Sequence, residues 1–314
     1  MQFKKPNFWD LSKPNLIAYL LLPFTLLIAV SNFILNNKTK KKFKDIKTIC
    51  VGNIYVGGTG KTPTTIRLYQ LLKELNLNVF TAKKFYQSQL DEINILEDKT
   101  KLIIGKTRSE IISKTHSNDK KILIFDDGLQ DKNIDYDLKC VCFDMKNWIG
   151  NGCLIPSGPL RESLRSLKKY DVVFLKDFKE TMIDIIDQIK INNKQIKIFE
   201  TFYEPTNLKN FKITENFLIF SGIGNPKNFK DLLVKYKFNI VEEIIYPDHH
   251  EYTENDINEI KNKAKKLNAK IITTEKDFVK IPKTNQMNIG FLGIELKIKK
   301  EADLINFLKQ KIYA

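Results

Sequence analysis

Apolar and polar positions alternate in blocks along most of the chain. Short β-branched runs recur from Lys47 onward, typical of buried strands: IKTICVGN, KILIFDD, LKCVCFD, DVVFLK, IKIFET, NFLIFSG and AKIITTE. Between them, helical spacing of apolar residues appears at 64–75, 228–236 and 254–267. Strands separated by helices are typical of βαβ units. The pattern predicts an α/β fold of the P-loop NTPase type, with a mostly parallel sheet and helices on both faces.

A different pattern precedes these units. Residues 14–37 carry no charge, and the run NLIAYLLLPFTLLIAVSNFIL is long enough to cross a bilayer core of about 30 Å. Pro23 and Thr25 interrupt the run, so a helix lying in the inner leaflet fits as well as a spanning one, and a buried core helix is a third alternative. Six lysines follow, and their attraction to anionic lipid favours the membrane. These are Lys38, Lys40, Lys41, Lys42, Lys44 and Lys47.

Length and pattern together suggest how the chain is divided. A chain of 314 residues has room for two ordinary domains. We predict a membrane-associated helix in residues 1–37, a nucleotide-binding domain in 38–178 and a second α/β domain in 179–314. The lysines after the apolar run place the following domain on the cytoplasmic side of the membrane.

The formal net charge of +15 calls for an explanation. Nucleic acid, an anionic membrane surface and a phosphorylated substrate are all suitable partners, and an AT-rich genome would by itself enrich lysine. The four cysteines form no CxxC pair and no histidine cluster accompanies them. Cys50, Cys140 and Cys142 lie in apolar strand-like runs and are interpreted as small buried hydrophobic residues. We therefore expect a reducing compartment, and we assign no metal to the cysteines.

The clearest chemical signal is a glycine-rich loop between a strand and a helix. The run TICVGNIYVGGTGKTPTTIRL has the strand, loop and helix context of a phosphate-binding loop. Lys61 is expected to reach the β- and γ-phosphates, and Thr62 to place its hydroxyl on Mg²⁺. Tyr55 stands where GxxxxGK[ST] has its first glycine. The predicted nucleotide-binding residues are Tyr55, Val56, Gly57, Gly58, Thr59, Gly60, Lys61 and Thr62.

A second strand supplies carboxylates. In the run KILIFDDGLQ an apolar strand ends in Asp126 and Asp127. At the carboxyl edge of a parallel sheet these carboxylates would reach the metal. Arg161, in NGCLIPSGPLRE, is a candidate for contacting a transferred phosphate, although a surface loop with a helix start is an equal alternative.

Two further segments carry ionisable groups. His249 and His250 in YPDHHEYTEND suit acid–base work, but Thr253 and Asp256 also resemble a capping box. Glu275, Lys276 and Asp277 follow the strand AKIITTE and either orient a site or cap a helix.

Taken in order, these motifs resemble the tetraacyldisaccharide 4'-kinases of lipid A synthesis. The resemblance runs through PNFW, VGNIYVGGTGKTP, DDGLQ, GNGCLIPSGPLRE, SGIGNPKNF, PDHHEYT and TTEKD, and it covers nearly the whole chain. It implies transfer of the γ-phosphate of ATP, with Mg²⁺, to the 4'-hydroxyl of a lipid A disaccharide precursor. It also implies a monotopic enzyme at the cytoplasmic face of the inner membrane, built from two α/β/α halves with the active site between them.

The resemblance also implies roles for individual residues. Asp91 in LDEIN matches the general base, assisted by His249 or His250 of the DHH motif. Asp126 and Asp127 match the metal carboxylates, joined by Glu162, while Arg161 matches the arginine of the PLRE pair. The stretch KKFYQ, residues 83–87, departs from the family's RGYG-type turn because it has no glycine.

Two rival functions are considered. One is a membrane-associated P-loop ATPase or GTPase switch; the chain has no obvious NKxD-type motif, which counts against GTP. The other is a nucleic-acid-binding ATPase, which only the net charge suggests and no recognised module supports. The sequence therefore predicts a lipid kinase without a nucleic-acid partner, and it specifies no protein partner.

Overall fold

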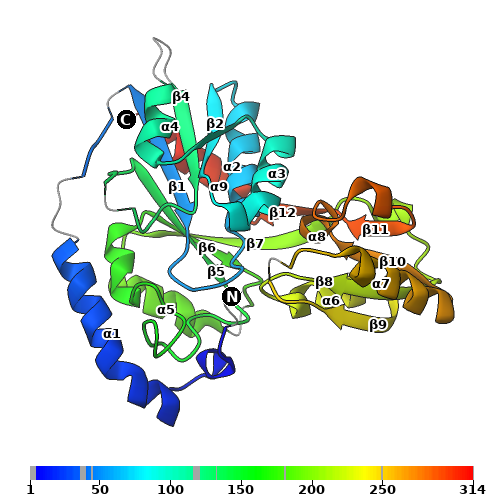
Figure 1. Ribbon diagram of the computed structural model, residues 1–314. Coiled ribbons are helices and arrows are strands. Elements are labelled where there is room, and N and C mark those ends of the chain that lie inside the picture. Colours follow the sequence, from blue (N-terminus) through cyan, green and yellow to red (C-terminus); the bar gives the residue numbers. More distant parts are fainter. Residues whose placement is uncertain are drawn as a thin grey trace. The chain divides into compact units, whose positions relative to one another are not determined.

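The computed structural model describes residues 5–35, 40–43, 45–115, 121–131, 133–179, 182–248 and 250–313, except for the side chains of residues 29 and 31–35. The chain forms two compact units (Figure 1). The larger comprises Lys5–Phe85, Lys99–Phe202 and Leu296–Ala314. The smaller contains Tyr86–Asp98 and Tyr203–Glu295.

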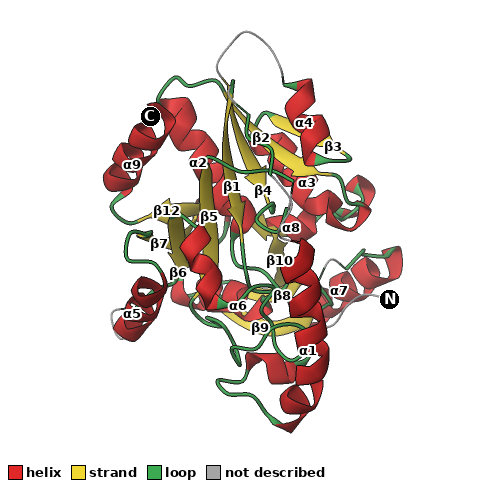
Figure 2. Ribbon diagram, turned by 90° about the vertical axis from the view of Figure 1, so that its left-hand side faces the viewer, coloured by secondary structure: helices red, strands yellow, loops and turns green. Residues whose placement is uncertain are grey.

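The larger unit is built on an eight-stranded sheet with the order β12-β7-β6-β5-β1-β4-β2-β3 (Figure 2). From β7 to β3 neighbouring strands pair in parallel. The chain runs outward from β1 on one side and returns through β4, then continues through β5 on the other side. β1 is thus the topological switch point of the sheet, and in open α/β sheets ligands bind beyond the carboxyl ends of the strands at such a point. The strands are β1 Ile46–Gly52, β2 Val79–Lys84, β3 Leu102–Gly105, β4 Lys121–Asp126, β5 Leu138–Asp144, β6 Val172–Lys176, β7 Lys197–Pro205 and β12 Ile294–Ile298.

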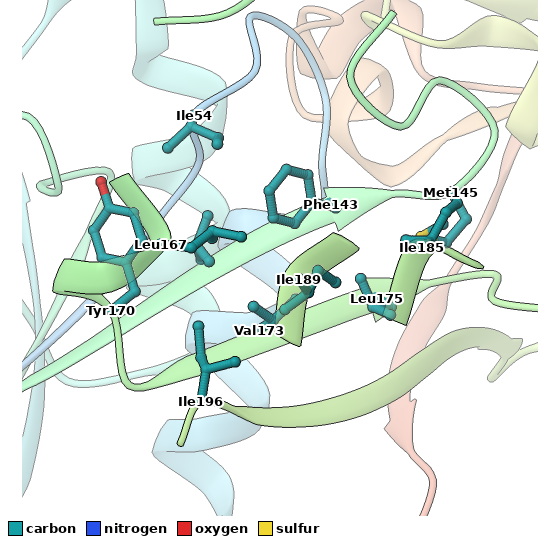
Figure 3. Close-up of a cluster of buried hydrophobic side chains, with 11 residues drawn as sticks. Ile54, Phe143, Met145, Leu167, Tyr170, Val173, Leu175, Ile185, Ile189 and Ile196 are labelled. Atoms are coloured by element: carbon teal, nitrogen blue, oxygen red, sulfur yellow. The ribbon is translucent and has the colours of Figure 1, made fainter. Parts of the chain in front are cut away.

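Helices cover both faces of this sheet. They are α2 Lys61–Glu74, α4 Arg108–Lys114, α5 Ile183–Asn192 and α9 Glu301–Tyr313. Phe143 of β5 forms a buried cluster with Ile185 and Ile189 of α5 (Figure 3). Val141 of β5 belongs to the same cluster. Cys142, between them in β5, faces the other way, and its thiol lies 3.7 Å from the Thr64 hydroxyl of α2. Because neighbouring side chains of a strand point to opposite faces, α2 and α5 lie on opposite sides.

The smaller unit repeats this layered plan around a parallel sheet with the order β11-β10-β8-β9. Leu218 and Phe220 of β8 pack in one cluster with Ile257 of α7. Phe217 of β8 packs in a second cluster with Phe229 of α6. The predicted α/β fold is confirmed for both units. The elements are β8 Asn216–Ser221, α6 Pro226–Lys235, β9 Asn239–Ile245, α7 Glu254–Lys266, β10 Ala269–Thr274, α8 Glu275–Phe278 and β11 Ile289–Leu292, with α3 Leu90–Lys99.

The boundary between the units differs from the predicted division. The position between residues 178 and 179 lies inside the larger unit, because β7, which follows it, pairs with β6. The chain passes into the smaller unit after Phe202, and it also does so briefly from Tyr86 to Asp98. The apolar pattern does not mark β2 as a strand, because lysines occupy the last two of its six positions.

The N-terminal apolar run forms the helix α1, Leu16–Leu35, with Pro23 inside it. It belongs to the larger unit, where Ala18 is buried and the Thr25 hydroxyl lies 2.7 Å from that of Ser157. Most of its other described apolar side chains are exposed, including Leu16 at 74% and Leu27 at 69%. Among the described residues, the structure contains no helix with the length and apolar character needed to cross a membrane.

Candidate nucleotide and acid–base sites

The switch-point strand β1 leads directly into the predicted phosphate loop. The loop bends at Gly57 and Gly60, whose φ angles of 131° and 86° favour glycine. Gly60 caps α2, which begins at Lys61. The open amino end of a helix presents unpaired N–H groups and the positive end of its dipole, which suits a phosphate.

Asn53 holds the loop from within. Its side chain is fully buried, and its amide donates to the Gly57 carbonyl at 3.2 Å and to the Thr59 hydroxyl at 3.0 Å. The backbone carbonyl of Asn53 accepts from the side-chain amide of Gln130 at 2.8 Å. Asn53 therefore links the start of the loop both to its glycine turn and to the DDGLQ segment.

Tyr55, which replaces the first glycine of the usual pattern, is buried and acts as an anchor. It pairs with Leu160 in an isolated antiparallel bridge, and the next residue, Val56, donates to the Pro159 carbonyl at 2.9 Å. Its hydroxyl donates to Asp10 at 2.6 Å. Burial, then Asp10, raises the pKa of this phenol, so it stays protonated. The substitution thus fixes the loop to two other segments.

The two principal P-loop side chains meet the DDG carboxylates. Lys61 Nζ lies 3.7 Å from Asp127 Oδ2, and the Thr62 hydroxyl donates to Asp126 Oδ2 at 3.0 Å. β1 and β4 are adjacent and parallel, so both sequence motifs end at the same edge of the sheet. The structure thus brings together Lys61, Thr62, Asp126 and Asp127, four of the residues that the sequence assigns to phosphate or metal binding.

Asp126 has a further partner that sequence reasoning missed. Lys83, at the end of β2, places its ammonium 2.6 Å from Asp126 Oδ2, with both side chains almost completely buried. Thr65 of α2 donates to the other carboxylate oxygen at 3.4 Å. Asp126 is therefore fixed from three directions.

Asp127 lies at a strained turn that basic side chains hold. Its φ of 58° is uncommon for a residue with a side chain. The guanidinium of Arg108 donates to the Asp127 carbonyl and, at 3.0 Å, to Asp131. Arg161 lies 3.3 Å from the Asp127 carboxylate and donates to Gln130 at 3.3 Å. The structure thus brings Arg161 to the Lys61 and Asp127 pair.

Glu162 makes different contacts from those predicted. Its Oε1 accepts from Gln130 at 3.2 Å and from the hydroxyl of Tyr170 at 3.0 Å. Burial, followed by the charge of Glu162, raises the pKa of Tyr170, which keeps this phenol as a donor. In this arrangement Glu162 supports Gln130, and through it Asn53 and Arg161.

The oxygen donors at this edge fit a small divalent cation. The Thr62 hydroxyl and the carboxylates of Asp126 and Asp127 are hard ligands, and Mg²⁺ is usually held by one or two carboxylates together with substrate phosphates. Within the described part of the chain, no group of three or more His, Cys, Asp or Glu residues is placed to enclose a metal. One hydroxyl and two carboxylates leave further positions of the cation to phosphate oxygens and water, which is the usual arrangement for Mg²⁺.

Asp91 lies in the smaller unit, almost fully buried between two lysines. Its Oδ2 is 3.3 Å from Lys276 Nζ and 3.4 Å from Lys280 Nζ. Lys276 also contacts Asp248 of the DHH motif at 3.4 Å. The structure thus joins Asp91 to two motifs that are distant in sequence, and Lys280 is a member of this group that the sequence did not reveal.

The TTEKD segment both caps a helix and serves this group. The Thr274 hydroxyl accepts from the Asp277 N–H and donates to its carboxylate, which starts the short helix α8. This geometry turns Lys276 toward Asp91. Burial would lower the pKa of Lys276, but the charges of Asp248, Glu92 and Asp91 outweigh it and raise that pKa above its ordinary value. Lys276 is therefore a permanent cation.

Of the two histidines in the DHH motif, the structure describes His250. His250 Nε2 lies 3.1 Å from Asp256 Oδ2, and its ring stacks on Tyr246 at 4.5 Å. Thr253 and Asp256 form the expected capping box of α7. His250 is thereby tied to the start of α7. His249 lies outside the described residues.

The chain is similar to known proteins in sequence and in fold. The family model for tetraacyldisaccharide-1-P 4'-kinase (LpxK) matches residues 17–100 and 87–313. A tetraacyldisaccharide 4'-kinase of Pelagibacter ubique (strain HTCC1062) is 45% identical over 310 residues, covering 98% of each chain. One from Rickettsia rickettsii (strain Sheila Smith) is 36% identical over 318 residues, covering 96% of each.

A solved structure has the same fold. It is the "apo" form of LpxK from Aquifex aeolicus in complex with ATP, with a TM-score of 0.68 and 21% sequence identity. The match covers 95% of the present chain and 100% of the other.

The role of Asn53 leads to a first prediction. Asn53→Ala removes the hydrogen bonds that hold Gly57 and Thr59, so the loop must be ordered when the triphosphate binds. We expect ATP to bind roughly tenfold more weakly, which corresponds to about 1.4 kcal/mol. Isothermal titration calorimetry measures this, with Asn133→Ala, an exposed asparagine of the same unit, as control. Equal affinities for the two variants would contradict the role given to Asn53.

Proposed function

The chain belongs to the tetraacyldisaccharide-1-P 4'-kinase family, and we propose that it transfers the γ-phosphate of ATP to the 4'-hydroxyl of a tetraacyldisaccharide 1-phosphate. The observation that carries the proposal is the meeting of Lys61 and Thr62 with Asp127 and Asp126. A strand, a glycine turn, a helix start and a facing pair of carboxylates together make a triphosphate site.

The phosphate side of the reaction is supplied by the larger unit. Backbone N–H groups of the loop and the start of α2 bind the phosphates, and Lys61 neutralises charge on the transferred group. Arg161, held by Asp127 and Gln130, adds a second positive charge. Phosphoryl transfer depends mainly on positioning and charge stabilisation, which is what these residues provide.

Mg²⁺ would be held by the Thr62 hydroxyl with Asp126 and Asp127, and it would neutralise charge on the β- and γ-phosphates. The chain's own contribution is to fix these oxygens before the nucleotide arrives. Asp126 is fixed by Thr62, Thr65 and Lys83, and Asp127 is fixed through the turn that Arg108 clamps.

The acceptor side is assigned to Asp91. A sugar hydroxyl is a weak nucleophile, and a carboxylate that accepts its proton during transfer accelerates such a reaction roughly 10²–10⁴-fold. Lys276 and Lys280 hold the Asp91 carboxylate in one place by contacts of 3.3 and 3.4 Å. Its proposed assistant is His249, because the ring of His250 is engaged with Asp256 and Tyr246.

The helix α1 suits a lipid acceptor. Its exposed apolar side chains would enter the cytoplasmic face of an inner membrane, where a multiply acylated disaccharide resides. Lysines follow directly, and each would be attracted to anionic lipid by about 1 kcal/mol. We propose that α1 lies in the membrane–water interface and does not span the bilayer, because its Thr25 hydroxyl contacts Ser157, in the loop between β5 and β6.

The proposed activity is tested by product analysis. The full chain is incubated with Mg²⁺, γ-labelled ATP and a tetraacyldisaccharide 1-phosphate in detergent, and we expect the label in the lipid. A Lys61→Ala variant serves as control, because it loses the cation that binds the phosphates. Release of labelled phosphate without labelled lipid would instead support a membrane-associated ATPase switch.

The base assignment is tested by Asp91→Asn, which keeps the shape of the side chain but removes most of its basicity. We expect turnover to fall about 10²–10⁴-fold while ATP affinity stays within a factor of two, because the phosphate-binding groups are untouched. Asp98→Asn, an exposed position in the same helix, is the matched control. Turnover close to that of the unsubstituted protein would show that another group accepts the proton.

Membrane attachment is tested on the exposed face of α1. Replacing Leu16, Leu20 and Leu27 by serine removes about 1.5–3 kcal/mol of apolar burial per leucine, so binding to vesicles with anionic lipid should fall more than tenfold. The control replaces the exposed Ile183, Ile191 and Met287 by serine, residues that lie outside α1. Vesicle binding that is equally strong in both triple variants would rule out α1 as the anchor.

A further inference from the structure

Lys83 occupies an unusual position for a lysine. It lies near the carboxyl end of β2, which has a neighbouring strand on each side, and it is 1% exposed. The register of β2 and β4 pairs Ala82 with Phe125, so the next residues, Lys83 and Asp126, emerge side by side at the edge of the sheet. The position of Lys83 is thus set by strand pairing.

The ammonium and the P-loop threonine share one oxygen. Lys83 Nζ lies 2.6 Å from Asp126 Oδ2, and the Thr62 hydroxyl donates to the same atom at 3.0 Å. A divalent cation that used Thr62 and Asp126 would therefore lie within a few ångströms of a buried positive charge. In a buried environment such a repulsion is strong, because water screens it little.

Fold stability alone is a weak explanation for this pair. Removing two charges from water costs several kcal/mol per ion, and a buried ion pair often contributes no more than apolar side chains of the same volume. A second buried pair, Lys176 and Asp144 at 2.6 Å, lies at the ends of β6 and β5 in the same unit. It offers a comparison in which the carboxylate is not one that Thr62 contacts in the structure.

We propose that Lys83 is a positioning residue that holds the Asp126 carboxylate on Thr62 and makes divalent cation binding conditional on the nucleotide. Without a triphosphate, the Lys83 charge opposes a second cation at Asp126. The phosphates add negative charge at the same edge, and the cation then binds together with them. The inference rests on the proposed function, in which Thr62 and Asp126 take Mg²⁺.

The proposal also gives a use to the segment that departs from the family pattern. KKFYQ lacks the glycine of the family's turn, yet its first residue is the one that contacts Asp126. The segment that departs from the family pattern therefore begins beside the carboxylate proposed to bind the metal.

The test is Mn²⁺ binding to the full chain without nucleotide, measured by calorimetry for the unsubstituted protein, Lys83→Met and Lys83→Arg. We expect Lys83→Met to bind Mn²⁺ at least tenfold more tightly, and Mn²⁺ to raise its unfolding temperature more than that of the unsubstituted protein. Lys83→Arg keeps the positive charge and should bind Mn²⁺ as weakly as the unsubstituted protein does. Unchanged or weaker Mn²⁺ binding by Lys83→Met would overturn the proposal.

Two further variants separate this role from a purely structural one. Lys176→Met breaks the comparison pair and should lose thermal stability without a similar gain in Mn²⁺ affinity; an equal gain would overturn the proposal. Lys83→Gln keeps a hydrogen-bond donor without the charge and replaces Lys83→Met if that variant does not fold. The Mg²⁺ concentration that gives half-maximal kinase activity should fall at least tenfold in the uncharged Lys83 variant, and an unchanged value would count against it.

Failure of the inference is distinguishable from failure of the proposed metal site. Asp126→Asn should weaken Mn²⁺ binding in the complex with a non-hydrolysable ATP analogue. If Asp126→Asn has no effect there, the assignment of the metal ligands is wrong. If Asp126→Asn weakens binding and Lys83→Met leaves it unchanged without nucleotide, the metal site stands and the role of Lys83 is refuted.

Discussion

The hydrogen bond from the Thr62 hydroxyl to the Asp126 carboxylate is the contact on which the nucleotide site depends. It exists because β1 and β4 are adjacent and parallel, so that their carboxyl ends lie at one edge of the sheet. The chain reverses its direction of winding at β1, and ligands of open α/β sheets bind at such a switch point. The remaining parts of the site are arranged around this contact. Lys83 reaches Asp126 from β2, while Arg161 reaches Asp127 from the loop before β6.

Several loops share the task of keeping this edge in one conformation. The P-loop has Tyr55 in place of its usual first glycine. The hydroxyl of Tyr55 donates to Asp10, and its backbone pairs with that of Leu160 in an isolated bridge. Gln130 connects Asn53, Arg161 and Glu162 through one side chain. The same loop that carries Arg161 also contacts the N-terminal segment, since Trp9 donates to the Pro156 carbonyl at 3.0 Å. The loop proposed to bind phosphate is thus held in place by contacts with several other segments, which is the arrangement that preorganised sites require.

The smaller unit solves a different electrostatic problem. A buried carboxylate is costly unless positive charge or hydrogen bonds compensate it, and Asp91 is compensated by Lys276 and Lys280. Asp277 and Asp248 in turn contact these lysines. The result is a network of alternating charges in which Asp91 has a defined position. The segment that carries Asp91 belongs to the smaller unit although the chain on either side of it belongs to the larger one.

The fold class and the presence of a phosphate-binding loop can be predicted from the sequence, because both follow from local patterns. Period, strand ends and the GGTGKT run indicate βαβ units and a phosphate loop without knowledge of distant contacts. The order and spacing of the motifs were enough to identify the family. Other features depend on which strands pair and in what register. They are the partners of Asp91 and Asp126, the contacts of Glu162 and the passage of the chain into the smaller unit after Phe202. Lys83 appears in the sequence as one lysine among many, and only the pairing of β2 with β4 makes it the buried cation beside Asp126.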